Sequence, residues 1–271
     1  MSQAPFSTLP LAREVQPLLQ TRRFGHTLRD YQTVDSTNTK AMRWAGDGAP
    51  EGSVVLAEYQ TAGRGRHGRS WQADPGQNLM LSVVLRPALP PQRLNLITLA
   101  ASIAIAEAVD ACVAPLTTAI KWPNDVLLEG SKCCGMLLES TFSASGRATV
   151  ILGIGLNVNQ RSFPPALENR ATSLLLQTGR RIPRAPLLAD LLGRLERYYD
   201  KFGADKEAAI RQAYEARLYG LGHPTALRLA GQEHPITGLL LGIADTGALR
   251  LHTDDGPRTF HAGEIYQAST F

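Results

Sequence analysis

The chain has 271 residues, of which 44% are hydrophobic and 19% charged, a composition typical of a globular protein with a full core. Its net charge of +4 suits an anionic ligand or an acidic partner, but is too small to indicate nucleic acid by itself. No run of about 18 apolar residues and no signal peptide are evident, so we expect a cytoplasmic protein without a membrane span.

The residue pattern predicts a mixed α/β (α+β) protein in three parts. Residues 1–29 form a lead with a short helix near 11–19, residues 30–221 form the main domain, and residues 222–271 form a small β module. Short β-like runs separated by turn signals mark this last part. In the main domain we expect helices at 39–44, 94–113, 187–202 and 206–218, and strands at 53–59, 79–85, 119–122, 126–128, 135–142 and 148–156.

Residues 58–71 are the most informative segment, because they place three glycines and three arginines between two apolar strands. Gly63, Gly65 and Gly68 allow close backbone approach, and the arginines supply forked cationic donors suited to a phosphate. The segment satisfies G-x-G-x-x-G. A dinucleotide-binding turn also needs a helix immediately afterwards and an acidic residue about 20 positions on, and both are missing.

Three further motifs are each ambiguous when taken alone. Lys121-Trp-Pro-Asn-Asp125 reads as a stiff turn, and Lys132 before Cys-Cys-Gly135 reads equally well as a lysine at a hairpin tip. Gly153-Ile-Gly155-Leu-Asn157 is either a strand end whose backbone a ligand can approach closely, or a bulge or tightly packed strand. Ser36-Thr37-Asn38 caps a helix or offers polar groups to a ligand.

The cysteine and histidine residues indicate neither a disulfide framework nor a structural metal. There are three cysteines, and the adjacent Cys133 and Cys134 fit buried small hydrophobes. The six histidines are scattered singly, without the spacing of metal ligands.

Taken together, these motifs give the chain a specific resemblance. In order and spacing it resembles the monofunctional biotin protein ligases, which attach biotin to a lysine of biotin-dependent carboxylases. The resemblance runs from about residue 34 to residue 159 and more weakly through the C-terminal module. It implies a central mixed β-sheet flanked by helices, as in class II synthetases and biotin/lipoyl ligases, followed by an SH3-like barrel. It also implies that biotin and ATP give biotinyl-5′-AMP, from which biotin passes to a carrier-protein lysine.

The resemblance carries functional residues onto this sequence. The biotin site falls on Ser36, Thr37, Asn38, Gln60, Gly63, Arg64, Gly65, Arg66, Lys132, Gly135, Gly153 and Leu156. The ATP and adenylate site falls on Arg66, Arg69, Trp71, Asn124, Asp125 and Asn157.

Lys132, Arg64, Arg66 and Asp125 are the predicted catalytic residues. The two arginines and Lys132 would offset the repulsion between the biotin carboxylate and the α-phosphate, with Lys132 as an electrostatic clamp. Trp71 would stack on adenine. Asp125 would hold the Mg²⁺ that accompanies ATP or position the incoming lysine. Residues 63–69 are expected to be mobile until ligand binds.

The expected partner is the biotin carboxyl carrier domain of a carboxylase, with acetyl-CoA carboxylase the first candidate. Too few residues precede the catalytic region for a helix-turn-helix domain, so no DNA binding is expected. The sequence does not decide whether the protein forms a homodimer. Lipoate–protein ligase is the nearest alternative. A nucleic-acid-binding module is a second one, disfavoured by sparse aromatic residues, and a non-catalytic scaffold is a third.

Overall fold

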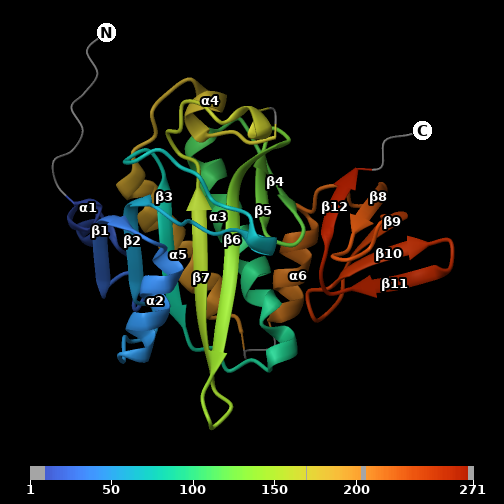
Figure 1. Ribbon diagram of the computed structural model, residues 1–271, viewed down its shortest axis with the longest axis horizontal. Coiled ribbons are helices and arrows are strands. Elements are labelled where there is room, and N and C mark those ends of the chain that lie inside the picture. Colours follow the sequence, from blue (N-terminus) through green and yellow to red (C-terminus); the bar gives the residue numbers. More distant parts are fainter. Residues whose placement is uncertain (1–9, 169, 203–205, 268–271) are drawn as a thin grey trace.

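The computed structural model describes residues 10–168, 170–202 and 206–267. Its main body is a seven-stranded sheet in the order β1-β2-β3-β7-β6-β5-β4 (Figure 1). Only β1 and β2 pair in parallel, so the sheet is mixed. Its strands are β1 Leu28–Val34, β2 Val54–Gln60, β3 Leu79–Leu85, β4 Thr118–Lys121, β5 Asp125–Leu128, β6 Ser131–Phe142 and β7 Ala148–Leu156.

Six α-helices and four short 3₁₀ turns occur in the described residues. The helices are α1 Leu11–Val15, α2 Thr37–Gly46, α3 Asn95–Val113, α4 Leu174–Thr178, α5 Arg184–Tyr199 and α6 Glu207–Glu215. The 3₁₀ turns are Gln16–Leu18, Arg66–Gly68, Pro91–Arg93 and Pro165–Leu167.

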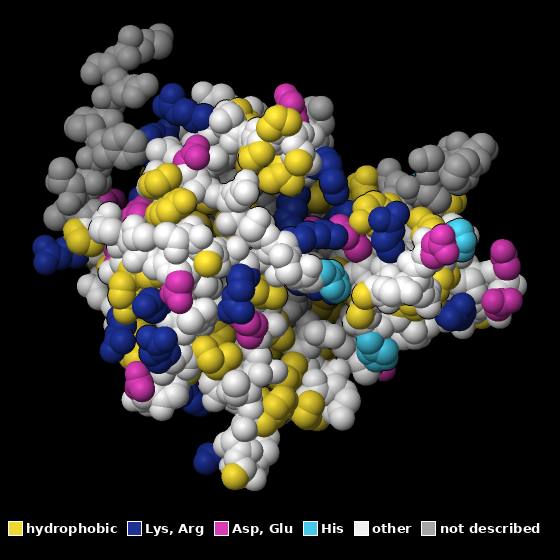
Figure 2. Space-filling model, viewed as in Figure 1, with side chains coloured by type: hydrophobic (Ala, Val, Ile, Leu, Met, Phe, Trp, Pro, Cys, Tyr) yellow, Lys and Arg dark blue, Asp and Glu magenta, His cyan; other side chains and the backbone are white. Residues whose placement is uncertain are grey.

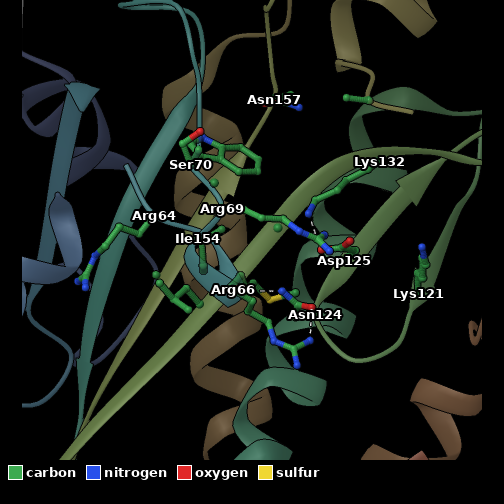
Figure 3. A pocket seen from close by; sticks show the side chains of 18 of the residues that line it. Arg64, Arg66, Arg69, Ser70, Lys121, Asn124, Asp125, Lys132, Ile154 and Asn157 are labelled. Atoms are coloured by element: carbon green, nitrogen blue, oxygen red, sulfur yellow. Dashed lines mark hydrogen bonds and ion pairs between the residues drawn. The ribbon is translucent and has the colours of Figure 1, made fainter. Parts of the chain in front are cut away.

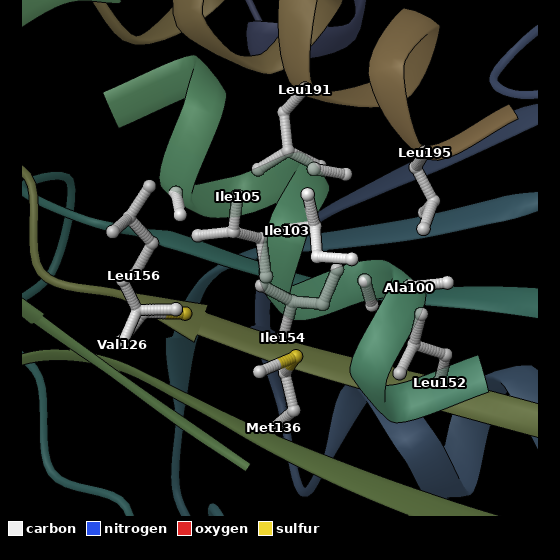
Figure 4. Close-up of a cluster of buried hydrophobic side chains, with 14 of the residues drawn as sticks. Ala100, Ile103, Ile105, Val126, Met136, Leu152, Ile154, Leu156, Leu191 and Leu195 are labelled. Carbon is white, nitrogen blue, oxygen red and sulfur yellow. The ribbon is translucent and has the colours of Figure 1, made fainter. Parts of the chain in front are cut away.

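Alternating strand residues divide the sheet into two covered faces. On one face, Ile103 and Ile105 of α3 pack with Leu152 and Ile154 of β7 and with Leu191 of α5 (Figure 4). On the other face, the smaller α2 packs on the intervening strand residues. The segment Pro91–Val113 is long and apolar enough to cross a membrane, but 78% of an apolar 18-residue stretch within it is buried inside the fold, as in a core helix.

The C-terminal part is a second, antiparallel sheet of five strands in the order β11-β10-β9-β8-β12. The strands are β8 Pro224–Arg228, β9 Ile236–Ile243, β10 Leu249–Thr253, β11 Gly256–Phe260 and β12 Glu264–Gln267. This sheet lies beside α6 (Figure 1). Trp122 of the main domain donates from Nε1 to the carbonyl of Gly247, 3.1 Å away. The small β module predicted for this region is confirmed.

Most predicted elements are present, but several boundaries were wrong. Strand β1 was missed, because its mostly polar residues sit at a sheet edge and show no apolar alternation. The short helix α4 was also missed. Helix α5 begins three residues earlier than predicted, and the helix expected at 11–19 ends at Val15 before a 3₁₀ turn containing Pro17.

Helix α2 begins at Thr37, two residues before the predicted start. Ser36 occupies the N-cap position with extended backbone, as expected of a cap. Its side chain makes no capping hydrogen bond, however, so the proposed hydroxyl cap is not formed. The Ser36 side chain lines a cavity instead.

Candidate active site

A cavity of about 500 Å³ opens on the α2 face of the main sheet, next to the C-terminal sheet. The segment 63–69, called here the ligand loop, covers it together with Trp71. Figure 2 shows Lys and Arg side chains gathered in the hollow between the two sheets. The strand ends of β5, β6 and β7 supply its floor and one wall, as Figure 3 shows from close by.

The floor is made of backbone, because glycines occupy the cavity-facing positions of β6 and β7. Gly135 and Gly155 are register partners on these strands. A Cβ at Gly155 would lie 2.5 Å from the Trp71 ring, and one at Gly153 would lie 2.3 Å from Asn38 Oδ1. Real Cβ contacts are never this short, so Trp71 and Asn38 depend on these glycines for their positions.

Asp125 and Lys132 form the central charge pair of the cavity. Lys132 Nζ lies 2.7 Å from Asp125 Oδ1, and the two side chains are 34% and 16% exposed. Asp125 begins β5 and Lys132 lies near the start of β6, so a tight hairpin brings them together. Lys132 is therefore a strand residue rather than a hairpin tip. Its Nζ also lies 5.9 Å from the centre of the Trp71 ring.

The ligand loop folds back on itself. Gly65 N donates to Arg69 O and Trp71 N to Gly63 O, and His67 has a positive φ of 56°. Arg66 Nη1 donates to Asn124 Oδ1 over 3.0 Å. Burial lowers the pKa of Arg66 from its ordinary value, although a guanidinium stays protonated in proteins.

At the opposite end of the cavity, the side chains around Gln60 are polar and uncharged, and the Arg64 guanidinium on this side is paired with Glu139. Gln60 Oε1 accepts hydrogen bonds from the backbone N and the Oγ1 of Thr37, at 2.8 and 3.1 Å. Gln60 Nε2 is thereby oriented as a donor. Ser36 and Thr37 are both buried next to it.

At the end of the cavity near Lys132, two buried polar atoms are without hydrogen-bond partners in the described part of the chain. They are Trp71 Nε1 and Asn157 Oδ1. Asn157 is held through its Nδ2, which donates to Thr172 O over 3.1 Å. An unpaired buried polar atom is costly, and both residues line the cavity, so this end offers one donor and one acceptor to a ligand.

The structure gathers nearly all of the predicted site residues around this one cavity. Those lining it are Ser36, Thr37, Asn38, Gln60, Arg64, Gly65, Arg66, Arg69, Trp71, Asn124, Asp125, Lys132, Gly135, Gly153 and Asn157. Gly63 and Leu156 do not line it. Leu156 faces α3 in the core, because residues 152, 154 and 156 of β7 point away from the glycine face.

Sequence reasoning missed the contribution of the C-terminal sheet. Glu264 and Tyr266 of β12 line the cavity, and Lys121 Nζ lies 4.7 Å from the centre of the Tyr266 ring. Burial lowers the pKa of Lys121. Lys121 was part of a recognised motif, but Gly263-Glu264-Ile265 carries no signal of its own in a single sequence.

The adjacent cysteines do not form a metal site with the other side chains that the structure describes. Cys133 and Cys134 are buried, and burial raises the pKa of the Cys133 thiol to about 12. In the described ranges, no group of three or more His, Cys, Asp and Glu side chains is placed to hold a metal ion.

Comparison with known proteins identifies the class to which this fold and cavity belong. Residues 31–159 match the profile of the Biotin/lipoate A/B protein ligase family, and residues 220–266 match the Biotin protein ligase C terminal domain.

Individual relatives narrow the class. The biotin–[acetyl-CoA-carboxylase] ligase of Paracoccus denitrificans is 38% identical over 86% of this chain and 97% of its own length. The ligase of that name from Mycobacterium tuberculosis is also 38% identical, over 85% of both chains. The biotin protein ligase of Aquifex aeolicus, solved with biotin and ATP, aligns over 90% of this chain and 100% of its own with a TM-score of 0.78 and 29% identity. The chain belongs to the biotin protein ligase family.

Proposed function

We propose that this protein is an ATP-dependent biotin ligase that forms biotinyl-5′-AMP and transfers biotin to a lysine of a carboxylase carrier domain. The observation that carries this proposal is the continuity of the cavity. A neutral polar end at Thr37 and Gln60 leads directly to a cationic and aromatic end at Lys132 and Trp71. Biotin has a neutral ureido head and a terminal carboxylate, so its polarity matches this gradient.

The neutral end would bind the ureido head of biotin. Gln60 Nε2 is a donor for the ureido oxygen, and Ser36 lies beside it. Thr37 Oγ1 donates its proton to Gln60 Oε1, so it can accept from a ureido N–H. Gly153 leaves room for the Asn38 side chain, which would form the wall beside the bicyclic ring. This orientation points the valeryl chain and its carboxylate toward Lys132.

The nucleotide would occupy the end lined by Trp71 and Asn157. Trp71 offers its indole for stacking on adenine, worth about 1–3 kcal/mol per base. Asn157 Oδ1 is a free acceptor for the adenine amino group, and its side chain is already fixed by Thr172. Asn124 and Arg69 would flank the phosphates.

In the first step, a biotin carboxylate oxygen attacks the α-phosphorus of ATP and pyrophosphate leaves. Lys132 and Arg66 reduce the repulsion between the carboxylate and the phosphate and stabilise charge on the phosphoryl oxygens. In the second step, a neutral lysine ε-amine of the acceptor attacks the acyl carbonyl. AMP leaves with the electron pair of the broken acyl–phosphate bond, and the amine loses one proton.

Mg²⁺ fits the residues present without a dedicated protein cage. Magnesium is usually held by one or two carboxylates together with substrate phosphates. Asp125 would be the carboxylate in this role, and it would exchange its contact with Lys132 for the ion. The bound ion would supply positive charge against the phosphates.

The remaining assignments belong to the same proposal. The acceptor is a carrier domain with acidic surface, to complement the net charge of +4. Residues 30–221 and 222–271 are its catalytic and C-terminal domains, after a lead of residues 1–29. The protein would act in the cytoplasm, without DNA or membrane contact, and a homodimer is compatible with this reaction.

Pyrophosphate release from Mg-ATP tests the proposal, with biotin or lipoate as the only acyl donor. Release with biotin alone supports it. Release with lipoate would move the activity to the lipoate branch of the matched family, and no release with either donor would refute adenylation. Transfer is tested separately by following biotin onto a purified carboxyl carrier domain.

A further inference from the structure

Glu139 of β6 connects two parts of the cavity wall that are far apart in the sequence. Its Oε2 accepts a hydrogen bond from Asn38 Nδ2 at 2.7 Å and lies 2.9 Å from Arg64 Nη2. Glu139 lies on the same face of β6 as Gly135. The carboxylate therefore joins helix α2 to the first arginine of the ligand loop.

The polar atoms of Asn38 are all engaged within the protein. Oδ1 accepts from Ser82 Oγ at 2.6 Å, while Nδ2 donates to Glu139 and, at 3.3 Å, to the carbonyl of Leu137. Asn38 is also buried against Gly153. With its donors used, Asn38 serves as a fixed support for Glu139 rather than as a ligand for the substrate.

Arg64 is turned away from the reacting charges. In Figure 3 its guanidinium lies on the opposite side of the cavity from Lys132 and Asp125, whereas Arg66 reaches Asn124. Because the Arg64 guanidinium is paired with Glu139, it is not aimed at the place where the carboxylate and phosphate meet. The electrostatic role expected of Arg64 from the sequence is not what this geometry supports.

We propose that Glu139 is a positioning residue that anchors the closed ligand loop to the sheet by holding Arg64, with Asn38 as its fixed base. This inference rests on the proposed function. The anchored loop keeps water from the mixed anhydride, so Glu139 sets how much biotinyl-AMP reaches an acceptor lysine instead of being hydrolysed. Arg64 is then the loop's fastening point, and Arg66 and Lys132 remain with the chemistry.

Glu139→Gln is the discriminating variant. Asn38 and Arg64 both contact Oε2, and a glutamine oxygen in that position can still accept from Asn38. The variant removes the negative charge, so it weakens mainly the contact with the Arg64 guanidinium. The double variant Glu139→Gln/Arg64→Glu restores a donor–acceptor pair at that contact. Asp245→Asn is a matched control, because Asp245 pairs with Arg211 on the exposed surface away from the cavity.

Two measurements are made on the full-length protein. The first is tryptic cleavage after Arg66 and after Arg69 without ligands, which needs no enzymatic activity and can be compared in variants that lack the Arg64 site. The second is the ratio of AMP released to biotin transferred, with biotin, Mg-ATP and a carrier domain. In Glu139→Gln we expect about tenfold faster cleavage and a severalfold higher ratio, because a charge-assisted hydrogen bond is worth about that factor. The double variant recovers both.

Unchanged cleavage and an unchanged ratio in Glu139→Gln would overturn the anchor. Faster cleavage in a protein that releases no pyrophosphate with biotin would uphold the anchor and refute the proposed reaction instead. If Glu139→Gln folds poorly, Arg64→Gln breaks the same contact from the exposed side of the pair. Cleavage at the wild-type rate in Arg64→Gln would also contradict the proposal that Glu139 anchors the ligand loop through Arg64.

Discussion

Arg69 of the ligand loop and Glu264 of β12 form a two-pronged ion pair across 195 residues of sequence. Arg69 Nη1 lies 3.1 Å from Glu264 Oε1, and Nη2 contacts Oε2. The hydrogen bonds from Arg69 lower the pKa of the Glu264 carboxyl to about 2. The C-terminal sheet therefore touches the loop that covers the cavity, in addition to lining the cavity itself.

This pair predicts a specific dependence of stability on pH. The folded-state pKa of Glu264 lies below its ordinary value of 4.5, so the pair stabilises the fold above about pH 4.5. That contribution is lost as the pH falls toward 2. Because Arg69 is largely exposed, we expect Glu264→Gln to lower the free energy of unfolding by only about 1 kcal/mol at pH 7.

Urea denaturation at pH 7 and at pH 3 measures this effect. The difference between wild type and Glu264→Gln should shrink at the lower pH. A difference that stays constant or grows on acidification would show that the carboxylate charge is not the source of the stabilisation.

Two glycines on β7 provide paired variants that separate the substrates. Gly155→Ala places a methyl group against Trp71, so we expect the KM for ATP to rise about tenfold, a loss comparable to one stacking contact. Gly153→Ala displaces Asn38, so the KM for biotin should rise instead. Steady-state pyrophosphate release with each substrate varied checks this, and equal effects of both variants on both substrates would contradict it.

Lys132 should matter for adenylation more than for stability. Lys132→Ala removes the ammonium facing the reacting carboxylate, and loss of one such electrostatic contact costs about 10²–10³ in kcat. Biotin-dependent pyrophosphate release is the measurement, with Lys201→Ala, a lysine packed on Tyr198, as control. A decrease in kcat of less than threefold would show that Lys132 has no catalytic role in adenylation.

The ligand loop should become protected when both substrates bind. Its three arginines are trypsin sites, and all three are substantially solvent-exposed or lie at the cavity rim. We expect cleavage within residues 63–69 of the wild type to slow at least fivefold with biotin and Mg-ATP. Equal rates with and without substrates would mean that the loop has the same conformation throughout.

The sequence allowed the cavity to be predicted better than its surroundings. Motifs such as Lys121-Trp-Pro-Asn-Asp125 are contiguous, and they lie at strand ends that the sheet order brings together. Glu264 and Glu139 were missed because their importance comes only from partners 195 and 75 residues away. Leu156 was misplaced because the face of a strand residue depends on register, which a motif does not reveal.

Edge strand β1 escaped prediction for a different reason. Its residues are mostly exposed or half-buried, so they lack the continuous apolar runs of β2 and β3, and its position depends on parallel pairing with β2. The predicted start of α2, two residues too late, followed from reading Ser36 to Asn38 as a cap. The backbone was already helical at Thr37, where burial against the sheet outweighs the local signal.

The two charge pairs of the cavity also differ in when they can form as the chain folds. Asp125 and Lys132 belong to one tight hairpin, and hairpins close within about 1–10 μs. Arg69 and Glu264 can meet only after nearly the whole chain has been made and both sheets have docked, because their contact closes a loop of 195 residues. A chain emerging during synthesis would thus hold Lys132 in place early, and would fasten the ligand loop only after β12 has been made.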